Sequence, residues 1–121
     1  MHALLIAQDP DEAAVLSFVL QRAGLTITKA RALERVLHTG PDEPADIVVL
    51  ASRESPPVAQ IRRFRAQTKA LLLVIVGQID EHVQVDLIEA GTDLIVLRPF
   101  STRLLSVQVR ALLRRTAGAP F

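Results

Sequence analysis

The stretch that decides the fold reads Glu89-Ala90-Gly91-Thr92-Asp93-Leu94-Ile95-Val96-Leu97-Arg98-Pro99-Phe100. Ala90-Gly91 predicts the end of a helix, because glycine is favoured just after the last helical residue. The continuous apolar run from Leu94 to Leu97 is typical of a strand buried on both faces of a parallel sheet. The stretch therefore predicts a helix followed at once by a buried strand.

The same alternation of strand and helix extends through the rest of the chain. The predicted strands cover residues 3–7, 26–29, 47–50, 71–76 and 94–97. Apolar residues at helical spacing follow each strand, and they are Ala14, Val15, Phe18, Val19 and Leu20; Leu33, Val36 and Leu37; Val58, Ile61 and Phe64; Val83, Leu87 and Ile88; and Leu105, Val109, Leu112 and Leu113. Right-handed crossovers then predict an α/β fold, a three-layer, doubly wound (βα)5 sandwich with a five-stranded parallel sheet in the order 2-1-3-4-5.

Polar residues and glycines mark the helix ends. Asp9 or Asp11 can cap the first helix, and Gly24 ends it. Asp80 and Glu81 favour the N-terminus of the fourth helix through the helix dipole.

Length and composition fit one domain. The 121 residues are half hydrophobic, carry a formal net charge of +1 and include no cysteine. Disulfides and thiolate chemistry are therefore excluded, and the cytoplasm is the expected location. The longest apolar stretch, residues 70–77, is far shorter than the roughly 20 residues that a membrane helix needs. We expect residues 1–115 to form the domain and residues 116–121 to form a tail or the start of a linker, because helical periodicity ends there.

Five pieces of the chain, in order and at matching spacing, resemble a CheY-like response-regulator receiver domain. They are Ile6 through Pro10 with the helix to Gly24; Ala45-Asp46-Ile47-Val48-Val49-Leu50; Glu89-Ala90-Gly91; Arg98-Pro99-Phe100-Ser101; and Val109-Arg110-Ala111-Leu112-Leu113-Arg114-Arg115. The resemblance implies a flavodoxin-like sheet and a phosphotransfer site. In that family an aspartate ends the third strand, and an acidic pair after the first strand helps to hold Mg²⁺. A hydroxyl after the fourth strand and a lysine before a cis proline after the fifth bind the phosphoryl group.

The carboxylates that the resemblance implies are missing from this chain. Ala7 and Gln8 stand where the acidic pair belongs. Counting forward from Asp46 puts Ala51 at the phosphoacceptor position, whereas counting back from the following proline puts Ser52 there. A methyl group and a neutral amide offer almost nothing to Mg²⁺, which prefers anionic oxygen. Ser52 is interpreted as an ordinary loop hydroxyl, because a serine nucleophile needs an adjacent base or metal.

The remaining site positions have changed as well. Val76 takes the place of the hydroxyl, and Ile95 that of an aromatic switch residue. Arg98, before Pro99, keeps a positive charge, but its planar fork differs from the compact ammonium of lysine. The degenerate pocket so predicted comprises Ala7, Gln8, Ala51, Ser52, Val76, Arg98 and Pro99. We therefore expect no catalytic residue, metal or cofactor, and no enzymatic activity.

Other groups of polar residues do not suggest a second site. His2, His38 and His82 lack the spacing of metal ligands and are expected to be exposed. Two basic clusters fall on the third and fifth predicted helices, and they consist of Arg62, Arg63, Arg65 and Lys69, and of Arg110, Arg114 and Arg115. Direct nucleic-acid binding is not expected, because no aromatic residues interleave these clusters and the total charge is balanced.

Receivers commonly dimerise through the fourth helix, fifth strand and fifth helix by means of charge pairs. In this chain those positions have lost their usual partners, and the candidate interface comprises Asp86, Leu94, Leu104, Val107 and Gln108. Its leucines and valine either form a constitutive apolar interface or pack in the core, and periodicity does not separate the two.

The sequence therefore favours a pseudo-receiver that works without phosphorylation. Its expected role is a protein-interaction or dimerisation module in bacterial signal transduction or transcription regulation. The alternative is a sensor of a small anionic ligand that uses the vacated pocket around Arg98. A residual phosphotransfer enzyme would require a carboxylate nucleophile that the site positions do not supply.

Overall fold

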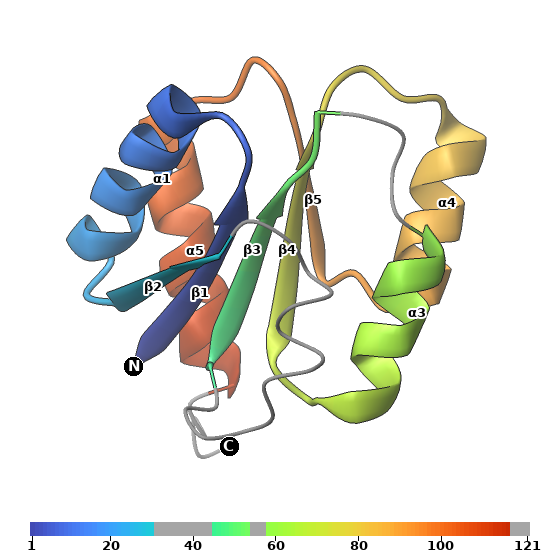
Figure 1. Ribbon diagram of the computed structural model, residues 1–121, viewed down its shortest axis with the longest axis horizontal. Coiled ribbons are helices and arrows are strands. Elements are labelled where there is room, and N and C mark those ends of the chain that lie inside the picture. The colour runs from blue at the N-terminus through green and yellow to red at the C-terminus, as the bar shows by residue number, and fades with distance from the viewer. Residues whose placement is uncertain (31–44, 54–57, 117–121) are drawn as a thin grey trace.

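A computed structural model gives the fold of the chain and describes residues 1–30, 45–53 and 58–116 (Figure 1). The strands are β1 (His2–Ala7), β2 (Thr26–Ala30), β3 (Ile47–Ala51), β4 (Leu71–Val76) and β5 (Leu94–Leu97). The helices are α1 (Pro10–Arg22), α3 (Val58–Gln67), α4 (Glu81–Ala90) and α5 (Thr102–Thr116). The predicted helix at Leu33, Val36 and Leu37 lies outside the described residues, as do His38 and residues 117–121.

The five strands form one parallel sheet in the order β2-β1-β3-β4-β5, which confirms the predicted order. Ile47 of β3 is in register with Ala3 of β1 and with Leu71 of β4. Every residue of β3 and β4 is buried, as expected for central strands covered on both faces. Strand β2 lies at one edge, where its alternating polar residues are exposed.

Helices cover both faces of the sheet, and the three predicted layers are present (Figure 1). On one face, α1 and α5 pack over a cluster that includes Leu16, Leu105 and Val109. On the other face, α3 and α4 pack over a cluster that includes Phe64 and Leu87. Each helix therefore buries one apolar stripe against the sheet.

Three apolar residues that recur at helical spacing in the sequence do not face the core. Val15 and Phe18 of α1 are 43% and 60% exposed, and Ile88 of α4 is 59% exposed. The buried stripe of α1 instead contains Leu16, Val19 and Leu20. The apolar positions of α1 cover more of its circumference than the sheet buries. Exposed apolar side chains are thus left on both sides of the molecule.

Side chains cap two of the helices as the sequence predicts. Of the two candidates for the cap of α1, Asp9 is the one observed. Its Oδ1 accepts a hydrogen bond from the backbone N–H of Asp11 at 3.0 Å. Oδ1 of Asp80 accepts from the backbone N–H of Val83 at 2.9 Å. These caps fix the starts of α1 and α4 directly beyond the carboxyl ends of β1 and β4. None of the helices in the described part of the chain is long and apolar enough to cross a bilayer.

Candidate functional site

The predicted pocket residues meet at the carboxyl edge of the sheet. Ala7 ends β1 and is in register with Ala51, which ends β3. The backbone N–H of Arg98, directly after β5, donates to the carbonyl oxygen of Val76 at 2.8 Å. Because parallel strands end at the same edge, the topology alone brings these four positions together.

The two candidates for the phosphoacceptor position differ in their surroundings. Ala51 is the last residue of β3 and is 3% exposed. Ser52 has left the strand, although its backbone N–H still donates to the carbonyl oxygen of Ile75 at 2.9 Å. Neither offers a carboxylate to this edge.

Two other predicted positions, Gln8 and Pro99, are exposed. The Arg98–Pro99 peptide bond is cis.

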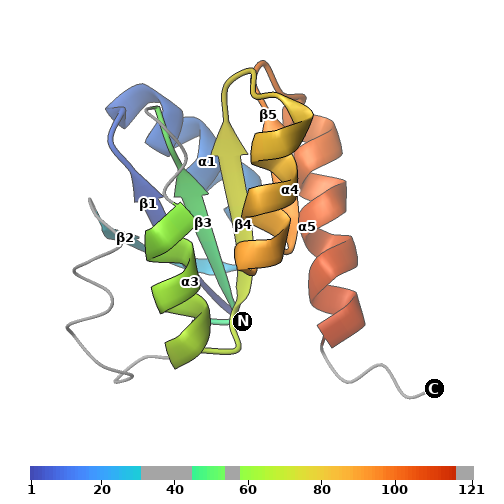
Figure 2. The same cartoon turned by 90° about the vertical axis from the view of Figure 1, so that its right-hand side faces the viewer.

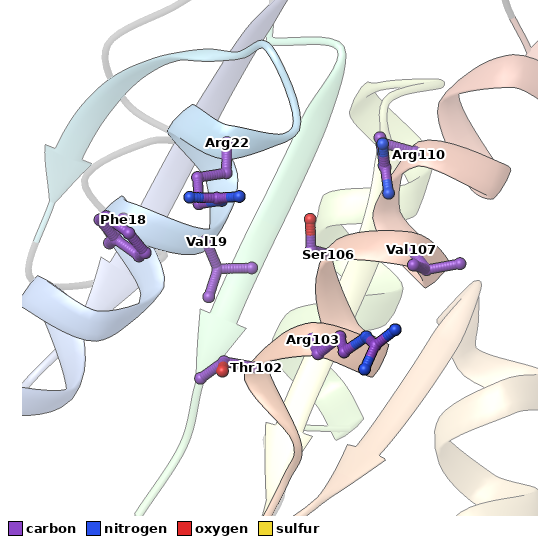
Figure 3. Close-up of a pocket in the computed structure, with 8 residues that line it drawn as sticks. All are labelled: Phe18, Val19, Arg22, Thr102, Arg103, Ser106, Val107 and Arg110. Atoms are coloured by element: carbon purple, nitrogen blue, oxygen red, sulfur yellow. The ribbon is translucent and has the colours of Figure 1, made fainter.

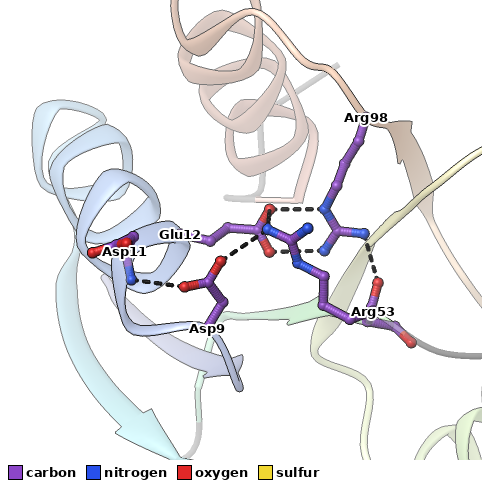
Figure 4. A network of polar contacts seen from close by, with 6 residues as sticks. Asp9, Asp11, Glu12, Arg53 and Arg98 are labelled. Carbon is purple, nitrogen blue, oxygen red and sulfur yellow. Dashed lines mark hydrogen bonds and ion pairs between the residues drawn. The ribbon is translucent and has the colours of Figure 1, made fainter.

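An ion pair between α1 and the β5–α5 connection occupies the edge (Figure 4). Nε of Arg98 donates to Oε2 of Glu12 at 2.7 Å, and Nη2 of Arg98 donates to Oε1 at 2.7 Å. Nη1 of Arg98 donates to the carbonyl oxygen of Ser52 at 2.6 Å. The arginine and glutamate side chains are only 15% and 8% exposed. This bidentate pair, together with the contact to Ser52, therefore joins α1 to the carboxyl ends of β3 and β5.

Arg53 forms a second, more exposed layer of the same network (Figure 4). Its Nη2 lies 2.9 Å from Oδ2 of Asp9 and 3.4 Å from Oε2 of Glu12. The Arg53 side chain is 48% exposed, so solvent screens this contact far more than the Arg98–Glu12 pair. Asp9, the second residue after β1, accepts hydrogen bonds from the backbone N–H of Asp11 and from Arg53.

The residues at this edge do not fit Mg²⁺. Both carboxylate oxygens of Glu12 accept hydrogen bonds from Arg98, and both of Asp9 accept from Asp11 N–H and Arg53. A cation there would have to displace a guanidinium from a carboxylate that already has two short, charge-assisted hydrogen bonds. In the described part of the chain, no group of three or more His, Cys, Asp or Glu residues is placed to hold a metal ion.

The Arg98–Glu12 pair also disfavours the binding of a small anion to Arg98. The Arg98 guanidinium donates to Glu12 and to the Ser52 carbonyl through all three of its nitrogens. A small anion that reached this guanidinium would have to displace the glutamate side chain, which is 8% exposed.

Glu12 is the site residue that the sequence prediction missed. It was overlooked because an acidic residue in the first turn of a helix is already explained by the helix dipole. A signal was present, since Glu12 precedes Leu16 by four residues and Val19 by seven. It therefore continues the buried stripe of α1 toward the carboxyl edge. A carboxylate on a buried stripe requires a partner, and Arg98 supplies it.

The candidate interface residues lie on two different surfaces. Leu104 is 56% exposed and, with Gln108, lines a groove of about 220 Å³ beside β5. Val107 is 47% exposed but lines a different groove, between α1 and α5. Leu94 is partly buried and packs against the core cluster under α1 and α5. Asp86 lies on α4, where one of its carboxylate oxygens is 3.7 Å from Nε2 of His82.

The structure describes two of the three histidines, His2 and His82. The ring nitrogens of His2 lie 2.8 Å from the hydroxyl oxygens of Thr26 and Thr28, so His2 is half-buried and the prediction that it is exposed was wrong. The side chain of His82 is 85% exposed, as predicted.

Comparisons with known proteins agree with this architecture. No protein-family model matches the chain, and no curated protein matches it in sequence. Among solved structures, a two-component response regulator from Clostridium difficile is 20% identical, covers 95% of this chain and 97% of its own, and superimposes with a TM-score of 0.84. This chain has the receiver fold.

Two further structures extend the likeness. An orphan response regulator of H. pylori is 20% identical, with 94% of this chain and 97% of that chain covered and a TM-score of 0.82. The BeF3-activated N-terminal receiver domain of Klebsiella pneumoniae RstA is 16% identical, with 94% and 99% covered and a TM-score of 0.82. The receiver fold implied by the sequence resemblance is therefore confirmed over nearly the whole chain.

Proposed function

We propose that this chain is a pseudo-receiver, a protein-interaction module of bacterial signal transduction or transcription regulation that works in the cytoplasm without being phosphorylated. The observation that carries the proposal is the Arg98–Glu12 pair. It lies where a receiver would place its phosphoryl group and its metal. Arg98 thereby links the carboxyl ends of β3 and β5 to α1, so the chain's own side chains hold this edge together.

The rest of the edge supports the same interpretation. Ala7, Gln8, Ala51 and Ser52 supply no carboxylate, and Val76 supplies no hydroxyl. A serine nucleophile would need an activating base or metal, and in the described part of the chain no group of three or more His, Cys, Asp or Glu residues is placed to hold a metal ion. A sensor for a small anion is less favoured, because the ligand would have to separate a buried ion pair.

The surface proposed for association lies along edge strand β5, with α4 and α5 on either side of it (Figure 2). We define this α4–β5–α5 surface by Asp86, Ile88, Ile95, Leu104 and Gln108. Ile88 and Leu104 are each more than half exposed, one on each helix. Apolar side chains that water reaches in the monomer favour association when a partner covers them. We propose that two copies of the chain pair through this surface.

Sedimentation equilibrium over a wide concentration range tests the proposal. We expect a dimer, and we expect Leu104→Glu to weaken it by at least about tenfold, because a charge would be buried in the interface. Val107→Glu is the matched control, since Val107 lies on the same helix at similar exposure but lines the other groove. Addition of Mg²⁺ with a small-molecule phosphoryl donor should leave the dissociation constant unchanged.

A chain that remains monomeric throughout would exclude self-association through this surface. Equal weakening by both glutamate variants would place the contact elsewhere on α5. A dissociation constant that changes with Mg²⁺ and the phosphoryl donor would contradict independence from phosphorylation.

A further inference from the structure

A second groove runs between α1 and α5, on the opposite side of α5 from the β5 groove (Figure 3). Its volume is about 500 Å³. Val19 and Ser106 lie between the two helices, and Phe18 and Val107, which are 60% and 47% exposed, lie at its two outer sides, on α1 and on α5 (Figure 3). A phenylalanine that leaves more than half of its surface in water is costly to keep there, so a covering partner would be favourable.

Three arginines also line this groove. Figure 3 shows Arg22 and Arg110 at one end of the groove and Arg103 toward the other. The Arg22 guanidinium carbon lies 5.6 Å from the centre of the Phe18 ring, which holds a cation against the aromatic face. None of the described residues that line the groove is acidic. The groove thus presents positive charge next to exposed apolar side chains.

We propose that this groove binds an acidic amphipathic helix of a partner protein. Arg103 and Arg110 are seven residues apart on α5, which corresponds to about 10 Å along the helix axis. Two carboxylates seven residues apart on a partner helix have the same separation. Apolar side chains three and four residues after the first carboxylate would then face Phe18 and Val107. This groove is separate from the α4–β5–α5 surface, so the proposal does not depend on the proposed dimer.

Charge argues against two other occupants. A second copy of the chain, paired by twofold symmetry through this groove, would bring two sets of the same arginines together without facing carboxylates. A nucleic-acid backbone would satisfy the arginines but would leave Phe18 and Val107 against phosphates, with no gain from their apolar surface. An acidic amphipathic helix satisfies the charges and also covers the apolar side chains.

The test uses a synthetic helical peptide of about 18 residues with glutamates at i and i+7 and leucines at i+3 and i+4. We expect saturable binding, with chemical-shift changes confined to the groove around Phe18 and Val107. The double variant Arg103→Glu/Arg110→Glu should weaken binding by about tenfold or more, and it should bind the peptide that carries lysines in place of the two glutamates. Arg62→Glu/Arg63→Glu, two exposed positions on α3 across the sheet, is the matched control and should have little effect.

The proposal is overturned by any of three results. One is the absence of saturable binding by the acidic peptide. Another is equal weakening by the control variant, which would mean that only the overall charge matters. The third is a DNA duplex that shifts the same groove residues and displaces the peptide, which would assign the groove to nucleic acid.

Discussion

Each end of the sheet is held by one arginine, but the two arginines bind different kinds of group. At the amino end, Arg65 of α3 donates to the carbonyl oxygens of Gly91 and Ala70, each at 2.8 Å, and to the carboxylate of Asp93 at 2.9 Å. At the carboxyl end, Arg98 holds both oxygens of Glu12 and one carbonyl oxygen. Arg65 therefore binds mainly backbone, whereas Arg98 depends on one other side chain.

The two arginines therefore differ in what they require from the rest of the sequence. The carbonyl oxygens of Gly91, directly after α4, and of Ala70, directly before β4, are present whatever the side chains, so these contacts of Arg65 need no particular partner side chain. The Arg98–Glu12 pair exists only because two particular side chains, 86 positions apart, are both present. The pair lies at the edge where β1 and β3 end in Ala7 and Ala51, neither of which carries a carboxylate.

The largest effect is expected from breaking the Arg98–Glu12 pair. Glu12→Ala leaves a guanidinium that is 15% exposed without its carboxylate, which should lower the free energy of unfolding by about 3–5 kcal/mol. Urea denaturation measures this loss. The double variant Glu12→Leu/Arg98→Met should recover most of it, because an apolar pair leaves no buried charge. A loss of under about 1 kcal/mol in Glu12→Ala would contradict this expectation. It would show that water reaches the Arg98–Glu12 pair and that the pair contributes no more to stability than the exposed contact of Arg53.

A smaller loss is expected at the amino end. Arg65→Ala removes the donors to the Gly91 and Ala70 carbonyls and should cost about 2–3 kcal/mol, since part of the lost hydrogen bonding is replaced by water. Amide hydrogen exchange should accelerate at the start of β5, because Asp93 would lose its arginine while it still binds the N–H of Leu72. Unchanged exchange there would mean that Arg65 does not hold the α4–β5 turn.

The smallest effect is expected from the outer arginine of the pocket. Arg53→Ala should change the free energy of unfolding by only about 0–1 kcal/mol, because its side chain is 48% exposed and its contact with Asp9 is screened by water. Urea denaturation of Arg53→Ala and Glu12→Ala under the same conditions compares the cost of removing an exposed residue and a buried residue of the same network. A cost equal to that of Glu12→Ala would mean that the network acts as one unit.

The fold could be predicted almost completely from the sequence. The strands at 71–76 and 94–97 were predicted at their observed bounds, because a continuous apolar run between polar turns marks where a buried strand begins and ends. The helix faces were predicted less well. Phe18 and Ile88 fit helical spacing yet are exposed, and spacing cannot say where an apolar stripe ends.

The site could be predicted only in part. Its position followed from topology, since Ala7, Ala51, Val76 and Arg98 all lie at strand ends. The ion pair at the site could not be predicted. The partner of Arg98 is Glu12 of α1, and nothing in a single sequence pairs two residues that are 86 positions apart. The division of Leu104 and Val107 between two grooves also required the structure, since both positions are exposed and lie within one turn of α5.

The most direct test of independence from phosphorylation is an NMR titration of the chain with Mg²⁺ and beryllofluoride, a phosphoryl analogue. The account predicts no saturable chemical-shift change at Ala7, Gln8 and Ala51, because the edge has no acidic pair and Glu12 is held by Arg98. Saturable shifts clustered at those three residues would contradict it, because they would show that the edge still binds the metal and the phosphoryl analogue.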